Sequence, residues 1–164
     1  MKLRYKRVVL VVMIGCLLIG IVSYLFLNRC HYYEYDGTID TYIGSYQKDQ
    51  KIYTFDLKGF EVGEKVYLSL NDLYNWVVIE DEDAQVYVDY QKHTMVYQLS
   101  DTTYYIDFGR DEIKYNDDCI NVEKNNEHIY ISHKNIYLSV YFIEKILLKN
   151  EKIIKIENKN AIIS

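Results

Sequence analysis

One stretch of this chain carries a helical pattern of apolar residues directly after a strand-like segment. Within residues 70–77 the apolar side chains recur at i, i+3, i+4 and i+7, the spacing of one helix face: Leu70, Leu73, Tyr74 and Val77. Residues 65–68 before it are β-branched and aromatic, which favours a strand. Between the two, Ser69 stands where a hydroxyl caps a helix, and Asp72 adds a negative charge to the first turn. The pattern predicts a strand, a cap and a short helix.

A second copy of this pattern lies near the C-terminus. Residues 136–138 form the strand-like segment, and Ser139 stands at the cap position. The apolar face recurs over residues 140–147 at i, i+3 and i+7. A hairpin pattern follows each helix, at 86–97 in the first copy and at 153–163 in the second. The shared order of strand, cap, helix and hairpin predicts an internal duplication.

Alternating apolar and polar positions predict further strands around these two units. They lie at residues 38–43, 51–57, 103–108, 112–115 and 119–122. Nineteen tyrosines and the absence of proline also favour strands. We therefore expect an α+β fold, in which an antiparallel-sheet domain carries two short helices from a strand–helix–hairpin duplication.

A continuous apolar run, residues 8–27, contains neither a charge nor a proline. A helix of that length spans roughly 30 Å, the thickness of a bilayer core, at ~1.5 Å per residue. Basic residues cluster in the tail 1–7, and only Arg29 follows the run closely, which places the N-terminus in the cytoplasm. The sequence thus predicts a single-pass protein of the cell membrane, with a transmembrane signal-anchor at 8–27 in the lipid bilayer and an extracytoplasmic C-terminal part.

Two alternatives for this run remain open. A cleaved signal peptide needs a small-residue cleavage site, of which Val22-Ser23 is a poor version. The sequence Met13-Ile14-Gly15-Cys16 resembles a lipidation signal, but the ten residues after Cys16 stay apolar. Mass spectrometry of the mature N-terminus distinguishes cleavage and lipidation from an intact anchor.

Composition and charge exclude some classes of function for the C-terminal part. Hydrophobic residues make up 49% of the chain, enough for a packed core rather than general disorder. Five of the 19 basic residues lie in the tail or at Arg29, which leaves 14 against 24 acidic residues elsewhere. Such an acidic domain argues against binding nucleic acid, which needs clustered lysines and arginines.

No residues with the spacing of a catalytic or metal site stand out. His128 and His133 are five apart, so on a strand they point to opposite faces, and we expect them to be exposed strand-end histidines. The acidic run 80–83 lacks the regular ligands and the glycine of a calcium loop, and we expect a solvated connection. Ser69 and Ser139 lie in no nucleophile motif and are explained as caps.

The cysteines and tyrosines allow more than one interpretation. Cys16 lies in the apolar run, while Cys30 and Cys119 can form a bridge, cross-link two chains or stay free; free thiols are our expectation. Tyrosine-rich faces stack on sugars or partner proteins, but tyrosine is also an ordinary strand residue, and this simpler explanation is preferred.

The segment Tyr67-Leu68-Ser69-Leu70-Asn71, followed by an amphipathic helix and a hairpin, supports a family resemblance. It resembles the copper amine oxidase N-terminal-like (stalk) domain, whose pattern at this point reads Tyr-Val-Pro-Leu-Arg. Residues 105–109 are similar to that family's strand ending at a glycine. The resemblance covers residues 37–164, with half-units of about 37–100 and 101–164, after a linker at 28–36.

The chain also departs from the family pattern. Serine replaces the preferred proline at 69 and 139, and the preferred arginine is Asn71 in one copy and Tyr141 in the other. Val78 and Leu148 replace the glycine that ends each helix. The resemblance implies an exported bacterial α+β domain, often duplicated, in which an antiparallel sheet wraps a helix. It implies neither an enzyme nor a copper site.

These features favour a non-catalytic extracytoplasmic module that binds a protein or glycan of the bacterial cell envelope. The alternative is a structural or assembly subunit that holds a membrane partner, and a more remote one is an envelope hydrolase. We assign no catalytic, cofactor-binding or metal residue and expect no cofactor. The ligand-binding residues and the oligomeric state stay open.

Overall fold

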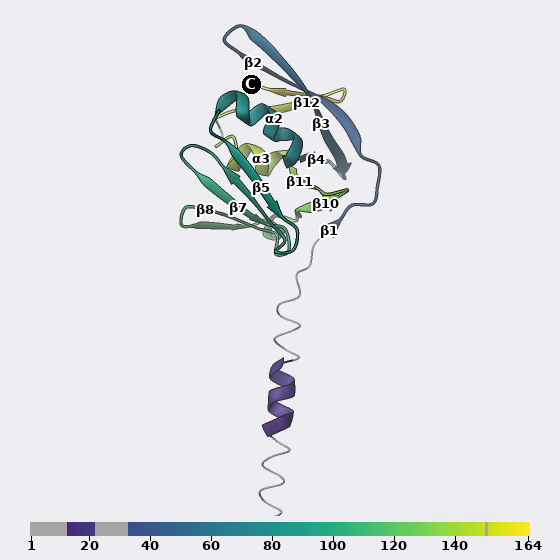
Figure 1. The fold of residues 1–164 in the computed structure, drawn as a ribbon. Coiled ribbons are helices and arrows are strands. Elements are labelled where there is room, and N and C mark those ends of the chain that lie inside the picture. Colours follow the sequence, from purple (N-terminus) through teal and green to yellow (C-terminus); the bar gives the residue numbers. More distant parts are fainter. Residues whose placement is uncertain (1–12, 22–32, 150) are drawn as a thin grey trace, which may run out of the picture. The chain divides into compact units, whose positions relative to one another are not determined.

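Figure 1 shows the computed structural model, which describes residues 13–21, 33–149 and 151–164. The chain divides into two compact units, Met1–His31 and Tyr32–Ser164. Within the first unit, residues 13–21 are helical. The second unit contains all the strands of the described chain.

The predicted transmembrane helix at 8–27 is not borne out by the described residues. None of the helices in the described ranges is long and apolar enough to cross a membrane. Residues 8–12 and 22–27 of the prediction lie outside the described part, together with the tail 1–7.

The predicted α+β class is also wrong, because the described residues are mostly sheet, with 48% in strands and 21% in helices. The two helices of the second unit are short: α2 is Leu70–Glu80 and α3 is Val140–Ile146. Most of the tyrosine- and isoleucine-rich sequence between and around them pairs into strands, since such side chains fit a pleated surface. The helices are therefore additions to two sheets.

The larger sheet has eight strands and is mixed rather than antiparallel. Its strands, in spatial order, are β1 (Tyr33–Glu34), β10 (Tyr130–Ser132), β11 (Asn135–Ser139), β4 (Lys65–Ser69), β3 (Lys51–Val62), β2 (Asp40–Lys48), β13 (Asn160–Ile163) and β12 (Ile154–Glu157). β1 runs parallel to β10 and β13 runs parallel to β2, while the other neighbours are antiparallel. β1 lies inside the segment predicted as a linker, residues 28–36.

The smaller sheet is an antiparallel meander of five consecutive strands. They are β5 (Gln85–Asp89), β6 (Thr94–Gln98), β7 (Thr103–Asp107), β8 (Glu112–Tyr115) and β9 (Asp118–Asn121). One turn of 3₁₀-helix, Glu123–Asn125, follows β9 and leads back to the larger sheet. Short loops join each pair of neighbours, so every contact in this sheet is local in sequence.

Both helices begin at the predicted serine caps. The Ser69 hydroxyl accepts a hydrogen bond from the backbone N–H of Asp72 at 3.2 Å, and the Ser139 hydroxyl accepts one from Phe142 N–H at 3.4 Å. Each bond satisfies one of the N–H groups that a helix start leaves without an intrahelical partner. The cap predictions are confirmed, and both serines are buried.

The strands that precede the helices pair with each other at the centre of the larger sheet. β4 and β11 are antiparallel, and Leu68 lies directly opposite Leu138. Because these two leucines are equivalent at an offset of 70 residues, the two copies are related by a local two-fold axis through this pair. The hairpin β3–β4 and the hairpin β10–β11 obey the same relation, since Glu61 pairs with Val66 and Ile131 pairs with Ile136.

The two following hairpins break this symmetry. β5–β6 joins the smaller sheet, whereas β12–β13 joins the larger one. Their pairing is equivalent at an offset of 67, as in Tyr87 with Val96 and Ile154 with Ile163. Their buried faces are opposite, however, because Met95 is buried while its counterpart Ile162 is exposed. The buried face of each hairpin is thus the one that packs on the core from the sheet to which the hairpin belongs.

The main core lies between the two sheets, around α2 and α3 (Figure 1). α2 packs on β3, β4 and β11, and α3 packs on β4 and β11. From the smaller sheet, the Tyr104 hydroxyl donates to the Ile146 carbonyl at 3.0 Å. On the opposite face of β4 and β11, Tyr67 and Tyr137 pack with Phe60, on which the ring of Tyr35 stacks.

Candidate functional site

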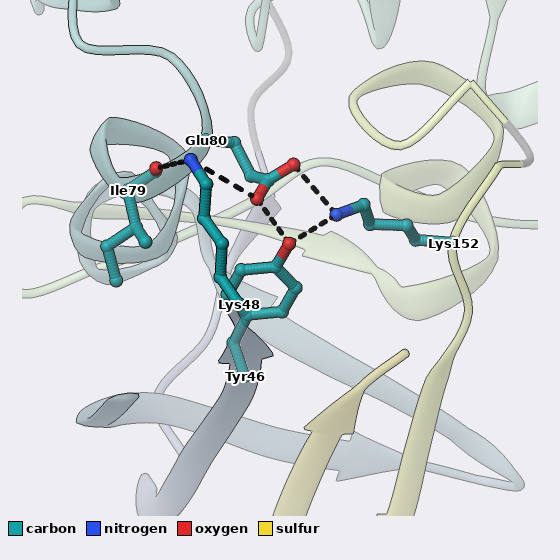
Figure 2. A network of polar contacts seen from close by, with 5 residues as sticks. All are labelled: Tyr46, Lys48, Ile79, Glu80 and Lys152. Carbon is teal, nitrogen blue, oxygen red and sulfur yellow. Dashed lines mark hydrogen bonds and ion pairs between the residues drawn. The ribbon is translucent and has the colours of Figure 1, made fainter. Parts of the chain in front are cut away.

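Three side chains from distant parts of the second unit meet in a polar network (Figure 2). Glu80 ends α2, Tyr46 comes from β2, and Lys152 lies between α3 and β12. The Lys152 ammonium donates to Glu80 Oε2 at 2.8 Å and to the Tyr46 hydroxyl at 2.6 Å, while that hydroxyl donates to Glu80 Oε1. The ammonium also lies 4.4 Å from the centre of the Tyr46 ring and 5.8 Å from that of Trp76.

The network supplies positive charge to the C-terminal end of α2. The last turn of this helix contains no basic residue of its own. The Lys48 ammonium donates to the Ile79 carbonyl at 2.5 Å and lies 3.9 Å from Glu80 Oε1. Figure 2 shows both contacts. Cations near a helix C-terminus interact favourably with its dipole, so Lys48 and Lys152 supply the positive charge that the last turn of α2 lacks.

The protonation states of the network follow from its hydrogen bonds. Burial opposes ionisation of Glu80, but the bonds from Lys152 and Tyr46 outweigh it and lower the pKa of this carboxyl. Burial, with the bond to Glu80, raises the pKa of Tyr46. Burial disfavours the Lys152 ammonium, but Glu80 and Tyr46 outweigh it and raise the pKa of this lysine. At neutral pH all three groups keep their usual charges, whereas a general acid or base needs a pKa near the working pH.

Two hollows flank this network, and Lys152 lines both. One, of about 610 Å³, lies beside the ends of β2 and β13, where Tyr46 and Ile162 line it. The other, of about 430 Å³, lies between the end of α2 and the segment after α3, with Trp76 and Leu147 in its wall. The polar groups between the two hollows bind one another. We therefore interpret the network as a structural link between β2, α2 and the segment before β12.

The acidic run 80–83 was expected to be a solvated connection, and Glu80, Glu82 and Asp83 are exposed. Two of its carboxylates also have side-chain partners. Glu80 belongs to the network, and Asp81 binds Ser100, accepting from its N–H and from its hydroxyl at 2.6 Å each. Those bonds from Ser100 lower the pKa of Asp81. Across the described residues, no group of three or more His, Cys, Asp or Glu side chains is placed to hold a metal ion.

His128 is the histidine for which the sequence-based expectation is wrong. Its Nδ1 lies 2.8 Å from Asp111 Oδ2, and its ring stacks on that of Tyr33 with a centroid distance of 3.6 Å. Asp111 is buried and also accepts the Ile129 N–H at 2.8 Å. Burial raises the pKa of Asp111, although the bonds from Ile129 and His128 oppose it. A carboxylate that orients an imidazole is one part of many catalytic sites, but the described contacts of His128 include no serine or cysteine side chain.

The other histidines and the cysteines are scattered. His133 is exposed at the β10–β11 turn, and its Nδ1 lies 3.1 Å from the Ser132 hydroxyl. His93 lies at the tip of the β5–β6 hairpin, beside the Phe108 ring. Cys119 on β9 is exposed with a free thiol, as is Cys16. His31 and Cys30 lie outside the described residues, so for Cys30 the expected free thiol stays a prediction, and the bridge to Cys119 stays the alternative to it.

The outer face of the smaller sheet presents a row of side chains that crosses all five strands. The row is set by the strand register and consists of Tyr87, Val96, Tyr105, Lys114 and Cys119. Tyr87 is 64% exposed and Tyr105 is 53% exposed. The two tyrosines lie two strands apart, which corresponds to about 10 Å. In β5 and β7 every second residue points to solvent, and Tyr87 and Tyr105 occupy such positions. The alternation was visible in the sequence, but it did not show which of the two faces is exposed.

Comparisons with known proteins give no relative for this chain. No family model, no curated protein and no solved structure matches it. The resemblance to the copper amine oxidase N-terminal-like domain therefore stays a prediction.

Proposed function

We propose that the second unit is a non-catalytic module that binds a neutral glycan of the cell envelope on the outer face of its five-stranded sheet. The observation that carries this proposal is the pair of exposed tyrosines, Tyr87 and Tyr105, on one face. A tyrosine offers a flat apolar ring and a hydroxyl with few rotatable bonds, which suits stacking on a sugar ring.

The charges around these tyrosines favour a neutral partner. Each carboxylate of the outer face has a basic partner: Asp89 with Lys92 at 3.5 Å, Asp107 with Arg110 at 3.8 Å, and Glu112 with Lys114 at 3.3 Å. These exposed pairs add little stability, but they cancel much of the local field. Amides and hydroxyls fill other outward positions of the face: Gln85, Thr94, Gln98, Thr103 and Asn121. Neutral hydrogen-bonding groups around aromatic rings match a polyol better than a charged polymer.

Two further observations support binding rather than catalysis. The Tyr46, Glu80 and Lys152 groups bind one another and are not tuned to titrate near neutral pH. The Asp111–His128 pair is covered by the ring of Tyr33. The contacts within both groups are explained by their role in holding neighbouring elements together.

The location at the cell membrane, with the C-terminal unit outside the cytoplasm, is part of the proposal. It rests on the basic residues of the tail 1–7 and on the apolar composition of 8–27. Protease digestion of intact cells tests it, because an extracytoplasmic unit is degraded while cytoplasmic proteins stay intact.

Co-sedimentation of the full-length chain with purified, insoluble envelope glycan tests the binding. We expect saturable binding that is reduced about tenfold or more by Tyr87→Ala combined with Tyr105→Ala, since stacking contacts of this kind dominate small interfaces. Ile52→Ala serves as the control, because Ile52 is an exposed apolar residue of the larger sheet.

Equal binding by the wild type and the double tyrosine variant would contradict the proposed face. Recovery of a stoichiometric membrane protein, without binding to glycan, would favour the assembly role instead. High salt distinguishes the mode of binding further: a neutral glycan stays bound, whereas a charged polymer is released.

A further inference from the structure

The smaller sheet ends at β5, an edge strand whose middle directs backbone groups away from the sheet. In the neighbouring pair β6–β7, the Phe108 N–H donates to the carbonyl of His93, just before β6. Backbone groups alternate in direction along an antiparallel strand, so odd-numbered residues of β6 face β7 and even-numbered ones face β5. The register joins these to the odd-numbered residues of β5. The N–H and C=O groups of Val86 and Val88 therefore point outward.

No other part of the described chain covers these outward groups with a hydrogen bond. The backbone bonds outside the sheets and helices include none to Val86 or Val88. Both residues are half-buried, and β5 pairs in its sheet with β6 alone. An edge of this kind is a template for pairing with another strand.

The other edges of the two sheets are protected. β1 has only two residues. On β12, the Ile154 N–H donates to the Glu144 carboxylate at 2.6 Å, and on β9 the Asn121 carbonyl accepts the side-chain amide of Asn125 at 3.4 Å. β5 has none of the usual protecting features. It contains neither lysine nor proline, it pairs with β6 without a bulge, and its one charged residue, Asp89, stands at its end.

The sequence of β5 is complementary to itself when two chains run antiparallel. With Tyr87 opposite Tyr87 of the second chain, each Val86 lies opposite a Val88, and their outward N–H and C=O groups bond one another. Gln85 then lies opposite Asp89 of the second chain, where an amide N–H meets a carboxylate. The two tyrosine rings form an aromatic pair across the strands, a favourable contact in antiparallel sheets.

The neighbouring registers are less favourable. Centred on Val86, the pairing would place Asp89 opposite Asp83, and like charges directly opposite each other are destabilising. Centred on Val88, it would place the Tyr87 ring opposite the Asp89 carboxylate. We propose that β5 is an interface for a second copy of this chain, paired antiparallel with Tyr87 at the two-fold axis, so that the two smaller sheets form one continuous sheet.

This pairing joins the outer faces of the two chains. A two-fold axis perpendicular to the sheet keeps both faces on the same side, so Tyr87 and Tyr105 of each chain form a single row. The central Tyr87 residues lie on adjacent strands, about 5 Å apart. The pairing rests on the strand edge and not on glycan binding. It lengthens the proposed glycan face without adding a new kind of contact.

Sedimentation equilibrium of the full-length chain in a density-matched non-ionic detergent measures the pairing without any glycan. We expect a monomer–dimer equilibrium with a Kd of about 100 µM, since small interfaces are weak and transient. Val88→Pro should raise the Kd about tenfold or more, because proline removes from each chain a donor that the pairing uses and the chain itself does not. Val88→Ala is the matched control, since it also loses the valine side chain but keeps the N–H.

Cysteine cross-linking tests the register and does not depend on the proline variant. In a chain whose own cysteines at 16, 30 and 119 are replaced by serine, Tyr87→Cys should form a disulfide-linked dimer when diamide takes up the two thiol hydrogens. Opposed residues of this kind have Cα atoms about 4.5 Å apart, within the range of a disulfide. Tyr105→Cys is the control, because its two copies lie roughly 24 Å apart, at ~4.8 Å per strand, and should not cross-link.

Three results would overturn the proposal. They are a monomer at every concentration up to about 1 mM, equally strong dimers of folded Val88→Pro and Val88→Ala, and equal cross-linking of Tyr87→Cys and Tyr105→Cys. Equal dimers of the two Val88 variants would place the contact elsewhere in the chain. A dimer with the expected pattern that binds no glycan would contradict the proposed function alone and leave the pairing in place.

Discussion

At the scale of single residues, Glu80 couples the stability of the fold to pH. Its pKa in the folded chain lies below the unfolded value of about 4.3, because Lys152 and Tyr46 donate to the carboxylate. The ionised group therefore stabilises the fold fully above that value, and this contribution is lost as the pH falls through the folded pKa.

This coupling gives a direct prediction for Glu80→Gln. We expect the wild type to have the larger free energy of unfolding at pH 7, by ~1 kcal/mol or more, and the difference to shrink as the pH falls to about 3. Urea unfolding at a series of pH values measures it. Glu82→Gln is the control, since Glu82 is an exposed carboxylate of the same acidic run. A difference that stays constant with pH would rule out the network as its source.

Sequence reasoning at this scale succeeds where the partners are close along the chain. Ser69 caps a backbone group three residues away, and the local pattern is sufficient to identify it. Glu80 bonds to Tyr46, 34 residues before it, and to Lys152, 72 residues after it. His128 bonds to Asp111, 17 residues away. Only folding brings such groups together. The residues next to Glu80 and His128 in the sequence therefore did not indicate their partners.

At the scale of elements, the first turn of α2 is bonded to a strand of its own copy, β3, and to a strand of the other copy, β11. The Asn71 side chain accepts the Ile136 N–H of β11, and the Asp72 carboxylate accepts the Lys58 N–H of β3 at 3.0 Å each. A helix of one copy is thus fixed to a strand of the other. The symmetric position at Tyr141 lacks this bond.

We predict that Asn71→Ala destabilises the fold by ~1–3 kcal/mol, because it leaves the Ile136 N–H without its partner in a largely buried place. Chemical denaturation followed by far-UV circular dichroism measures this change. Asn75→Ala is the control on the same helix, because Asn75 is exposed. Equal stability of the two variants would show that the bond between the copies contributes nothing.

The elements themselves were easier to predict than their neighbours. Alternation in 86–97 and 153–163 indicates a hairpin in each case, and hairpins form there. A period of two does not specify which strand lies alongside, and so the parallel pairs β1–β10 and β13–β2 were not anticipated. The constant sequence offset between the copies and the shared order of their elements predicted a repeat. They did not predict that the two hairpins enter different sheets, because that depends on packing against the core.

At the scale of the whole molecule, the second unit combines a symmetric centre with asymmetric surroundings. β4 and β11 pair about Leu68 and Leu138, and both faces of this pair are covered. Among the described residues, the five-stranded meander faces the core with one side, and Tyr87 and Tyr105 on its outer side are exposed. The predicted α+β class failed because the helices occupy few residues between two extensive sheets. The proposed glycan face lies on the first hairpin, β5–β6, and on the three strands that follow it, β7 to β9.

The most direct test of this account is an NMR titration of the full-length chain with soluble, neutral fragments of the envelope glycan. The account predicts saturable shifts of the backbone amides of Tyr87, Val96 and Tyr105, which lie side by side across β5, β6 and β7. Amides near Glu80 and Lys152, in the polar network, should stay unchanged. Shifts confined to that network or to the long β2–β3 hairpin, or no shifts at all, would contradict it.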